Sequence, residues 1–138
     1  MNAKEYMQSI RQIAARVKLL QAEVERLRAD AESVAINLDG MPKGTGKGDR
    51  LERLAIQLAE AESALQTEMS VLWSEKIEAI ELLGLLQSKH QAILTARYLD
   101  CKKWEQIAYE MDISWRYCYI LHGYALAELD KVLKRKKN

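Results

Sequence analysis

The sequence predicts an all-α protein, and three observations support this: its composition, a heptad repeat in its first third, and several short helical segments near its C-terminus. The 138 residues include six glycines, one proline and no phenylalanine. Glycine and proline interrupt helices, whereas the abundant Ala, Leu, Glu, Lys, Gln and Arg favour them. Apolar residues make up 49% of the chain, which is enough for a folded core.

Apolar residues in the first third of the chain recur with alternating steps of four and three positions. A repeat sustained over about four heptads is typical of a long helix with one coiled-coil face. Such a helix needs a partner along this face. The residues of the repeat are Tyr6, Ile10, Ile13, Val17, Leu20, Val24, Leu27, Ala31 and Val34.

A glycine-rich segment, residues 37–48, separates this helix from the next one. It contains four of the six glycines and the only proline, Pro42, so a loop is expected. Its Gly44–Gly48 stretch has the composition of a phosphate-binding loop, but the spacing of the P-loop motif is absent and no predicted strand precedes it. We therefore expect the tip of a helical hairpin and no nucleotide site.

A second heptad pattern follows the loop and predicts a second long helix. Its later part advances at four-residue steps, which suggests a stutter, and Trp73 in this part is expected to pack against the C-terminal unit. Two long helices joined by a loop predict an antiparallel, coiled-coil-like hairpin over residues 1–86. The residues of the second pattern are Leu51, Leu54, Leu58, Ala61, Leu65, Met69, Trp73, Ile77 and Ile80.

Three shorter helices are expected after residue 86. A tight turn at Asp112 precedes the last of them, with Ser114 as its N-cap. This order fits a helix-turn-helix, whose final helix enters the major groove of DNA, so residues 87–138 form a predicted DNA-binding unit. The expected helices cover about Lys89–Leu99, Trp104–Met111 and Ser114–Lys134.

Side-chain size and spacing also predict how this unit packs. Ala108 is small where two helices must cross, and Ile107, Met111 and Ile113 are expected to fill the space between them. The last helix should bury a stripe with steps of three and four positions. The predicted stripe comprises Cys118, Leu121, Ala125 and Leu129, with Tyr117 also in the core, and the outward side chains are Trp115, Arg116, Tyr119, Ile120 and His122.

The net charge of +1 is unevenly distributed. Residues 1–86 contain 11 Lys/Arg and 14 Asp/Glu, whereas residues 87–138 contain 10 and 6. An acidic assembly unit joined to a basic C-terminal unit suits a protein that binds nucleic acid. A solvated helix surface with a basic tail would give the same charges.

Several function classes find no support in the sequence. No stretch approaches the roughly 20 apolar residues of a membrane span, and the N-terminus lacks the apolar core of a signal peptide, so we expect a cytoplasmic protein with no membrane partner. Cys101 and Cys118 have no metal-like spacing and are expected to be reduced. His90 and His122 are isolated, and no catalytic grouping is evident. We therefore expect no enzymatic activity, cofactor or metal site.

The segment from Arg97 to Ser114, RYLDCKKWEQIAYEMDIS, together with Tyr117-Cys118 and residues 121–126 (LHGYAL), resembles region 4 of bacterial sigma factors. Nearly the whole chain, from the Met1–Tyr6 segment onward, is similar to a family of small sigma-region-4-like proteins encoded by phages and prophages of Gram-positive bacteria. Such proteins are associated with control of phage late-gene transcription. The resemblance implies a phage-encoded transcriptional regulator that binds promoter DNA in the bacterial host cell and acts with host RNA polymerase.

The resemblance also implies roles for individual residues of this chain. Positions that match phosphate contacts are Lys103, Trp104, Tyr119 and Tyr124, and those that match base-facing positions are Trp115, Arg116 and Ile120. The candidate DNA-binding set further includes the helix-opening Ser114, the family histidine position His122, and the basic residues Lys131, Lys134 and Arg135.

The predicted recognition helix departs from the family in its charge. Three positions that are often basic or polar carry Tyr119, Ile120 and Tyr124, and Arg116 is the only lysine or arginine between residues 104 and 130. Since phosphate neutralisation supplies most of the affinity of typical DNA binders, one module should bind weakly. A homodimer through the hairpin, the basic tail and RNA polymerase are three sources of additional affinity.

Other interpretations stay open. Trp115 and Tyr119 could form a protein-binding patch, Arg116 could take part in a surface salt bridge, and His122 could serve in packing. A DNA-packaging adaptor that resembles a small terminase subunit would also combine a helix-turn-helix with helical oligomerisation. A helix-turn-helix without DNA binding would only dock a protein.

Overall fold

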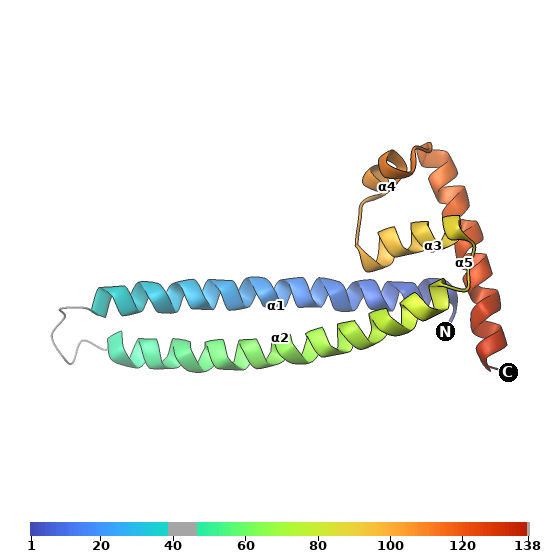
Figure 1. Ribbon diagram of the computed structural model, residues 1–138. Coiled ribbons are helices and arrows are strands. Elements are labelled where there is room, and N and C mark those ends of the chain that lie inside the picture. Colours follow the sequence, from blue (N-terminus) through green and yellow to red (C-terminus); the bar gives the residue numbers. More distant parts are fainter. Residues whose placement is uncertain (39–46, 138) are drawn as a thin grey trace. The chain divides into compact units, whose positions relative to one another are not determined.

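A computed structural model describes residues 1–38 and 47–137 of the chain. Every regular element in these two ranges is helical, without a strand, so the predicted all-α fold class is confirmed. Residues 39–46, which hold most of the predicted loop and of the Gly44–Gly48 stretch, lie outside the described residues. The elements are α1 (Ala3–Leu38), α2 (Lys47–Leu83), α3 (Ser88–Leu94), the π-helical turn η1 (Thr95–Leu99), α4 (Trp104–Met111) and α5 (Trp115–Lys137) (Figure 1).

The chain forms two compact units. Unit one consists of Met1–Ala14 and Val71–Asn138, and unit two consists of Ala15–Ser70. The division expected at residue 86 does not coincide with this boundary, because the start of α1 and the end of α2 contribute to the core of unit one. The three C-terminal helices therefore do not form a unit by themselves.

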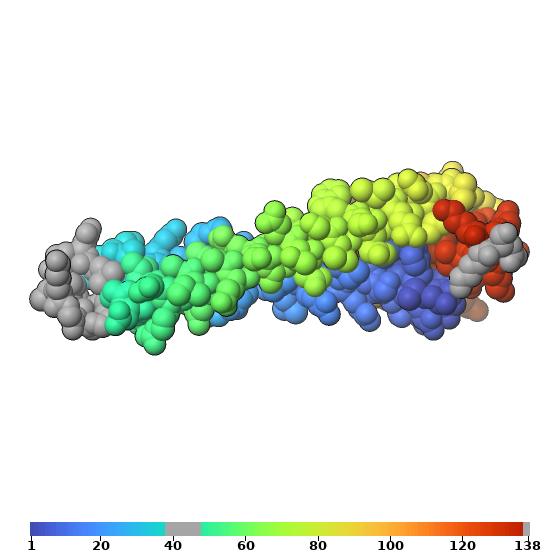
Figure 2. Space-filling model, turned by 90° about the horizontal axis from the view of Figure 1, so that it is seen from below, coloured from blue at the N-terminus to red at the C-terminus, as the bar shows by residue number. Residues whose placement is uncertain are grey.

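In unit two, the segments of α1 and α2 lie side by side and antiparallel, as Figures 1 and 2 both show. The predicted heptad repeat of α1 is confirmed, because each of its nine residues is buried or half-buried. The α1 residues buried in this unit are Val17, Val24, Leu27 and Val34. Since α2 of the same chain covers this seam, the seam does not require a second copy of the protein.

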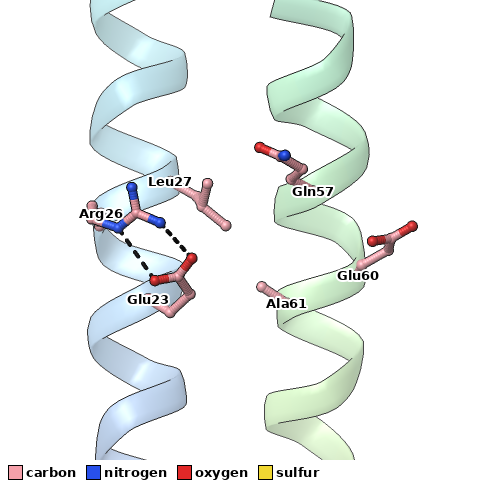
Figure 3. Close-up of a pocket in the computed structure, with 6 residues that line it drawn as sticks. All are labelled: Glu23, Arg26, Leu27, Gln57, Glu60 and Ala61. Carbon is pink, nitrogen blue, oxygen red and sulfur yellow. Dashed lines mark hydrogen bonds and ion pairs between the residues drawn. The ribbon is translucent and has the colours of Figure 1, made fainter.

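An open hollow of about 370 Å³ lies between the two helices of unit two (Figure 3). Leu27 of α1 and Ala61 of α2 line it, and the small Ala61 leaves space between the helices. Arg26, at its edge, turns back to Glu23 on its own helix and forms two hydrogen bonds with that carboxylate. Because the charge of Arg26 is already paired, this hollow is a poor candidate for an anion site.

Unit one has one apolar core, to which every one of its described helices contributes. Ala3, Met7 and Ile10 of α1 are completely buried in it, although they are the first apolar residues of a helix that continues into unit two. The largest fully buried side chains are Met7, Ile10, Leu82, Leu83, Ile93, Leu94, Ile107, Cys118 and Leu129.

The predicted register is wrong in the last part of α2. Trp73, Ile77 and Ile80 are 63%, 55% and 56% exposed, so Trp73 does not pack against the C-terminal helices. The buried and half-buried residues in this part of α2 are Glu68, Met69, Leu72, Glu75, Lys76, Ala79, Leu82 and Leu83. Because two seam positions are glutamates, apolar residues alone do not reveal this register.

The first turn of α1 is anchored to α5. The Asp130 carboxylate accepts a hydrogen bond of 2.7 Å from the backbone N–H of Ala3. Asn2 and Glu5 cap the same turn reciprocally, since the Asn2 side chain accepts the Glu5 N–H at 2.8 Å and the Glu5 carboxylate accepts the Asn2 N–H at 3.4 Å. These bonds satisfy N–H groups that a helix start leaves unpaired, and they hold the beginning of α1 in unit one.

The turn between α4 and α5 depends on Asp112, whose φ of 55° is left-handed. The Ile113 N–H donates to the Ala108 carbonyl at 3.0 Å, and the Asp112 N–H donates to the Tyr109 carbonyl at 3.2 Å. This is the Schellman pattern, in which glycine is the usual left-handed residue because it has no Cβ. The turn therefore places an aspartate at a left-handed position, where its Cβ makes the conformation less favourable than it would be for glycine.

Substitutions at Asp112 should separate side-chain strain from loss of contacts. Asp112→Gly is expected to keep or slightly raise the free energy of unfolding, because it relieves the Cβ conflict. Asp112→Val should lower it by about 1–2 kcal/mol relative to the glycine variant, since β-branched residues tolerate a positive φ poorly. Urea unfolding followed by circular dichroism measures both, and a valine variant as stable as the glycine variant would contradict the argument.

Candidate nucleic-acid interface

Ser114 opens α5 as its N-cap, as predicted. Its hydroxyl oxygen accepts a hydrogen bond of 3.1 Å from the backbone N–H of Tyr117, one of the groups that the first turn of a helix leaves without a partner. The predicted stripe is also confirmed, and it determines which face of α5 points outward. The buried residues of this stripe are Cys118, Leu121, Ala125 and Leu129.

The outward face of α5 carries five of the twelve candidate residues. Trp115, Tyr119, Ile120 and Tyr124 are 48%, 52%, 44% and 64% exposed. Arg116 is exposed as well, and no ion pair among the described residues involves it. Its guanidinium group is therefore available to an external partner.

Tyr117 is a correction to the predicted core. Its side chain is 42% exposed, because it lies at the flank of the buried stripe, where only part of a side chain reaches the core. Ile107 and Ala108 are buried as expected, and Met111 and Ile113 pack against the core while half-buried.

The remaining basic candidates lie before the start of α4 and near the end of α5. Lys103 is exposed and immediately precedes α4. Lys131, Lys134 and Arg135 are exposed on α5, which continues to Lys137 instead of ending near Lys134. Lys134 and Arg135 thus belong to the helix and not to a frayed tail.

His122 does not point outward as expected. Its Nε2 atom shares a hydrogen bond of 2.7 Å with the Tyr98 hydroxyl, and the Trp104 ring meets its ring edge-on, with 4.8 Å between ring centroids. The pKa of His122 is lowered to about 4, first by burial and then by the positive charges of Arg97 and Lys4. The imidazole is therefore neutral at pH 7 and brings no charge to a phosphate.

Trp104 lies at the centre of an aromatic cluster that includes His122 and Tyr119. Its ring centroid is 5.4 Å from that of Tyr119, which in turn is 6.4 Å from that of Trp115. The Trp104 side chain is half-buried in this cluster. The cluster joins the first helix of the motif to the outward face of α5.

Arg97 is a candidate site residue that sequence reasoning misses. Its guanidinium carbon lies 4.5 Å from the centroid of the Trp104 ring, and its Nη1 atom donates to the Lys102 carbonyl at 3.0 Å. It belongs to the π-helical turn η1, and such turns recur at functional sites. The sequence contains no signal for this turn, so only the position of Arg97 at the start of the segment that resembles sigma region 4 could have indicated it.

A cavity of about 290 Å³, here called the basic pocket, opens beside the aromatic cluster. It brings three cations of α1 and η1 together with aromatic side chains of η1, α4 and α5, and no acidic residue lines it. The lining residues are Lys4, Gln8, Arg11, Arg97, Tyr98, Trp104, Tyr119 and His122. Five of the eight lie between positions 97 and 122, a segment that the sequence did not link to residues 4–11.

Residues 1–38 and 47–137 contain neither a membrane-spanning helix nor a metal-binding cluster. No helix there is both long enough and apolar enough to cross a bilayer, and His, Cys, Asp and Glu side chains there form no group of three suited to a metal ion. Cys101 and Cys118 are free thiols. Compared with protein-family models, curated proteins and solved structures, the chain gives no match.

Proposed function

We propose that this protein is a phage-encoded transcriptional regulator that binds promoter DNA through α4 and α5 and acts together with host RNA polymerase. The observation that carries the proposal is the outward face of α5, where Arg116 stands unpaired between exposed aromatic and apolar side chains. Arginine donates two hydrogen bonds to guanine in the major groove, and apolar groups contact thymine methyls. This face therefore offers base-reading chemistry on the second helix of a helix-turn-helix sequence.

Gly123 supports a close external contact on the same helix. It lies exposed in the middle of α5, and a Cβ built on it would have no neighbour within 4 Å. Packing within the chain thus does not require glycine, although glycine inside a helix costs about 1 kcal/mol relative to alanine. A partner that approaches the helix backbone closely would account for it.

A protein partner is supported by the exposed part of α2. Trp73, Ile77 and Ile80 are spaced by four and three positions, so they lie on one face of the helix and are each more than half exposed. An apolar surface of this kind in a helical protein marks an interaction site. RNA polymerase is the partner we propose, because a weakly charged recognition helix needs a second source of affinity.

The test is selection of binding sites from a random duplex DNA pool at low salt, with and without bacterial RNA polymerase. The selected site should bind Arg116→Ala about 5- to 150-fold more weakly than wild type, which corresponds to roughly 1–3 kcal/mol for one base contact, and the variant should lose preference at one position. Lys89→Ala, which removes an exposed cation of α3 outside this face, is the matched control.

Failure to enrich any sequence under either condition would contradict the proposal. A wild-type protein that binds RNA polymerase but no DNA would instead favour a helix-turn-helix that only docks a protein.

A further inference from the structure

The charges of the basic pocket distinguish it from the hollow of unit two. Lys4, Arg11 and Arg97 all line it, yet none of them takes part in an ion pair within the part of the chain that the structure describes. In the hollow of unit two, by contrast, Arg26 is paired with Glu23 and Asp30. The pocket thus gathers positive charge and leaves it without a counter-charge.

Helical spacing explains how α1 supplies its share. Lys4, Gln8 and Arg11 are separated by four and three positions, so they lie along one face of the first turns of α1. The buried residues Ala3, Met7 and Ile10 occupy the adjoining face. Because the core and the Asp130 bond to Ala3 hold this part of α1 in place, the three polar side chains are presented to the pocket by a fixed backbone.

Arg97 is also held in advance of any ligand. Its contact with Trp104 and its hydrogen bond to the Lys102 carbonyl restrict the guanidinium group, which still has further N–H donors. Burial, followed by the positive charge of Arg11, lowers the pKa of Arg97. Since Arg11 and Arg97 line the same pocket, their like charges repel one another, and a bound anion would relieve this repulsion.

The pocket is small and continuous with the proposed DNA-binding face. Its 290 Å³ lie at the lower end of the range of about 300–1,000 Å³ for small-molecule sites, which suits a single anionic group. Tyr119 lines the pocket, and its ring also lies beside the ring of Trp115 on the outward face of α5. A group seated there would belong to the same ligand that α5 reads.

We propose that the basic pocket seats a backbone phosphate of the DNA bound by α5, with Lys4, Gln8 and Arg11 of α1 and Arg97 of η1 as its ligands. The inference rests on the proposed function and adds the N-terminal helix to the DNA interface. It also supplies the positive charge that the recognition helix lacks.

The experiment measures the binding of full-length protein to duplex DNA as a function of salt concentration. The variant Lys4→Gln/Arg11→Gln is expected to lower the slope of log K against log salt by about 1–2 and to weaken binding roughly tenfold or more at 0.05 M salt, equally for all sequences. Lys76→Gln/Lys89→Gln removes two cations of the same unit outside the pocket and should change neither quantity to this extent. The thermal midpoint of the pocket variant should be unchanged or higher, because like charges are removed.

Each outcome decides a different point. If the wild-type protein binds duplex DNA but the pocket and control variants have equal slopes of log K against log salt, the inference is overturned and the proposed function stays intact. A wild-type protein that binds no duplex at low salt would overturn both. Titration with inorganic pyrophosphate in the absence of DNA tests whether a free anion occupies the pocket. Micromolar binding that the pocket variant abolishes would overturn the assignment of a DNA phosphate as the occupant. Absence of such binding supports that assignment.

Discussion

Ile107→Ala is expected to lower the free energy of unfolding of unit one by about 2–5 kcal/mol. Ile107 is completely buried, and it lies in the core where α4 meets the other helices of unit one. Replacing the isoleucine side chain with a methyl group removes buried apolar surface and leaves a cavity that the surrounding helices fill only in part. Urea and thermal unfolding, followed by far-ultraviolet circular dichroism, measure the change.

The matched control for Ile107 lies on the same helix. Tyr109 is 86% exposed, and Tyr109→Ala should change the free energy of unfolding by no more than about 0.5 kcal/mol, since it removes almost no buried surface. Equal losses for the two variants would show that α4 does not pack as described. The same pair of variants tests whether α4 is held in place for any contact with DNA.

Trp104→Ala is expected to lower the free energy of unfolding by about 2–4 kcal/mol, somewhat less than a fully buried tryptophan would, and to change the titration of His122. The indole is half-buried, packs edge-on against His122 and supports the Arg97 guanidinium. Without it, water reaches the imidazole, so the pKa of His122 should rise from about 4 toward its usual 6.5. Two-dimensional NMR of the imidazole protons follows this directly.

The low pKa of His122 also predicts how stability depends on pH. Because the unfolded chain binds this proton near pH 6.5 and the folded chain only near pH 4, the contribution of neutral His122 is complete above pH 6.5 and is lost as the pH falls to 4. We expect about 1–2 kcal/mol after allowance for the half-exposed ring. His122→Gln should remove this part of the acid sensitivity, while Trp104→Ala should reduce it. If the unfolding midpoint of the wild-type protein falls no more with decreasing pH than that of His122→Gln, the low pKa of His122 is contradicted.

Local patterns were sufficient for the helices themselves. The four–three spacing from Tyr6 to Val34 predicted the buried face of α1, and the spacing of Cys118, Leu121, Ala125 and Leu129 predicted that of α5. Ser114 and Asp112 were recognised because capping and left-handed turns depend on the residue and its nearest neighbours. Features that arise within a few residues can be predicted from sequence.

The register of α2 shows why other features could not. Glu68 and Glu75 occupy seam positions, and Glu68 is tolerated because Arg16 of α1 lies 3.3 Å from its carboxylate. A pattern of apolar residues therefore pointed to Trp73, Ile77 and Ile80, which are exposed. The partner that makes a buried-side glutamate acceptable lies 52 positions away, and no local rule contains it.

The helices after residue 86 and the outward positions of Trp115, Arg116, Tyr119 and Ile120 were evident from the chain alone, as was the shortage of positive charge on α5, whereas the helix-turn-helix stays a prediction. Only the tertiary structure placed Lys4 and Arg11 beside Arg97, Trp104 and Tyr119, and turned His122 from a surface candidate into a half-buried, neutral ring. The physical reason is the same in both cases. Spacing along a helix determines which side chains share a face, whereas the neighbours of that face are set by contacts between residues about a hundred positions apart, which depend on how the whole core packs.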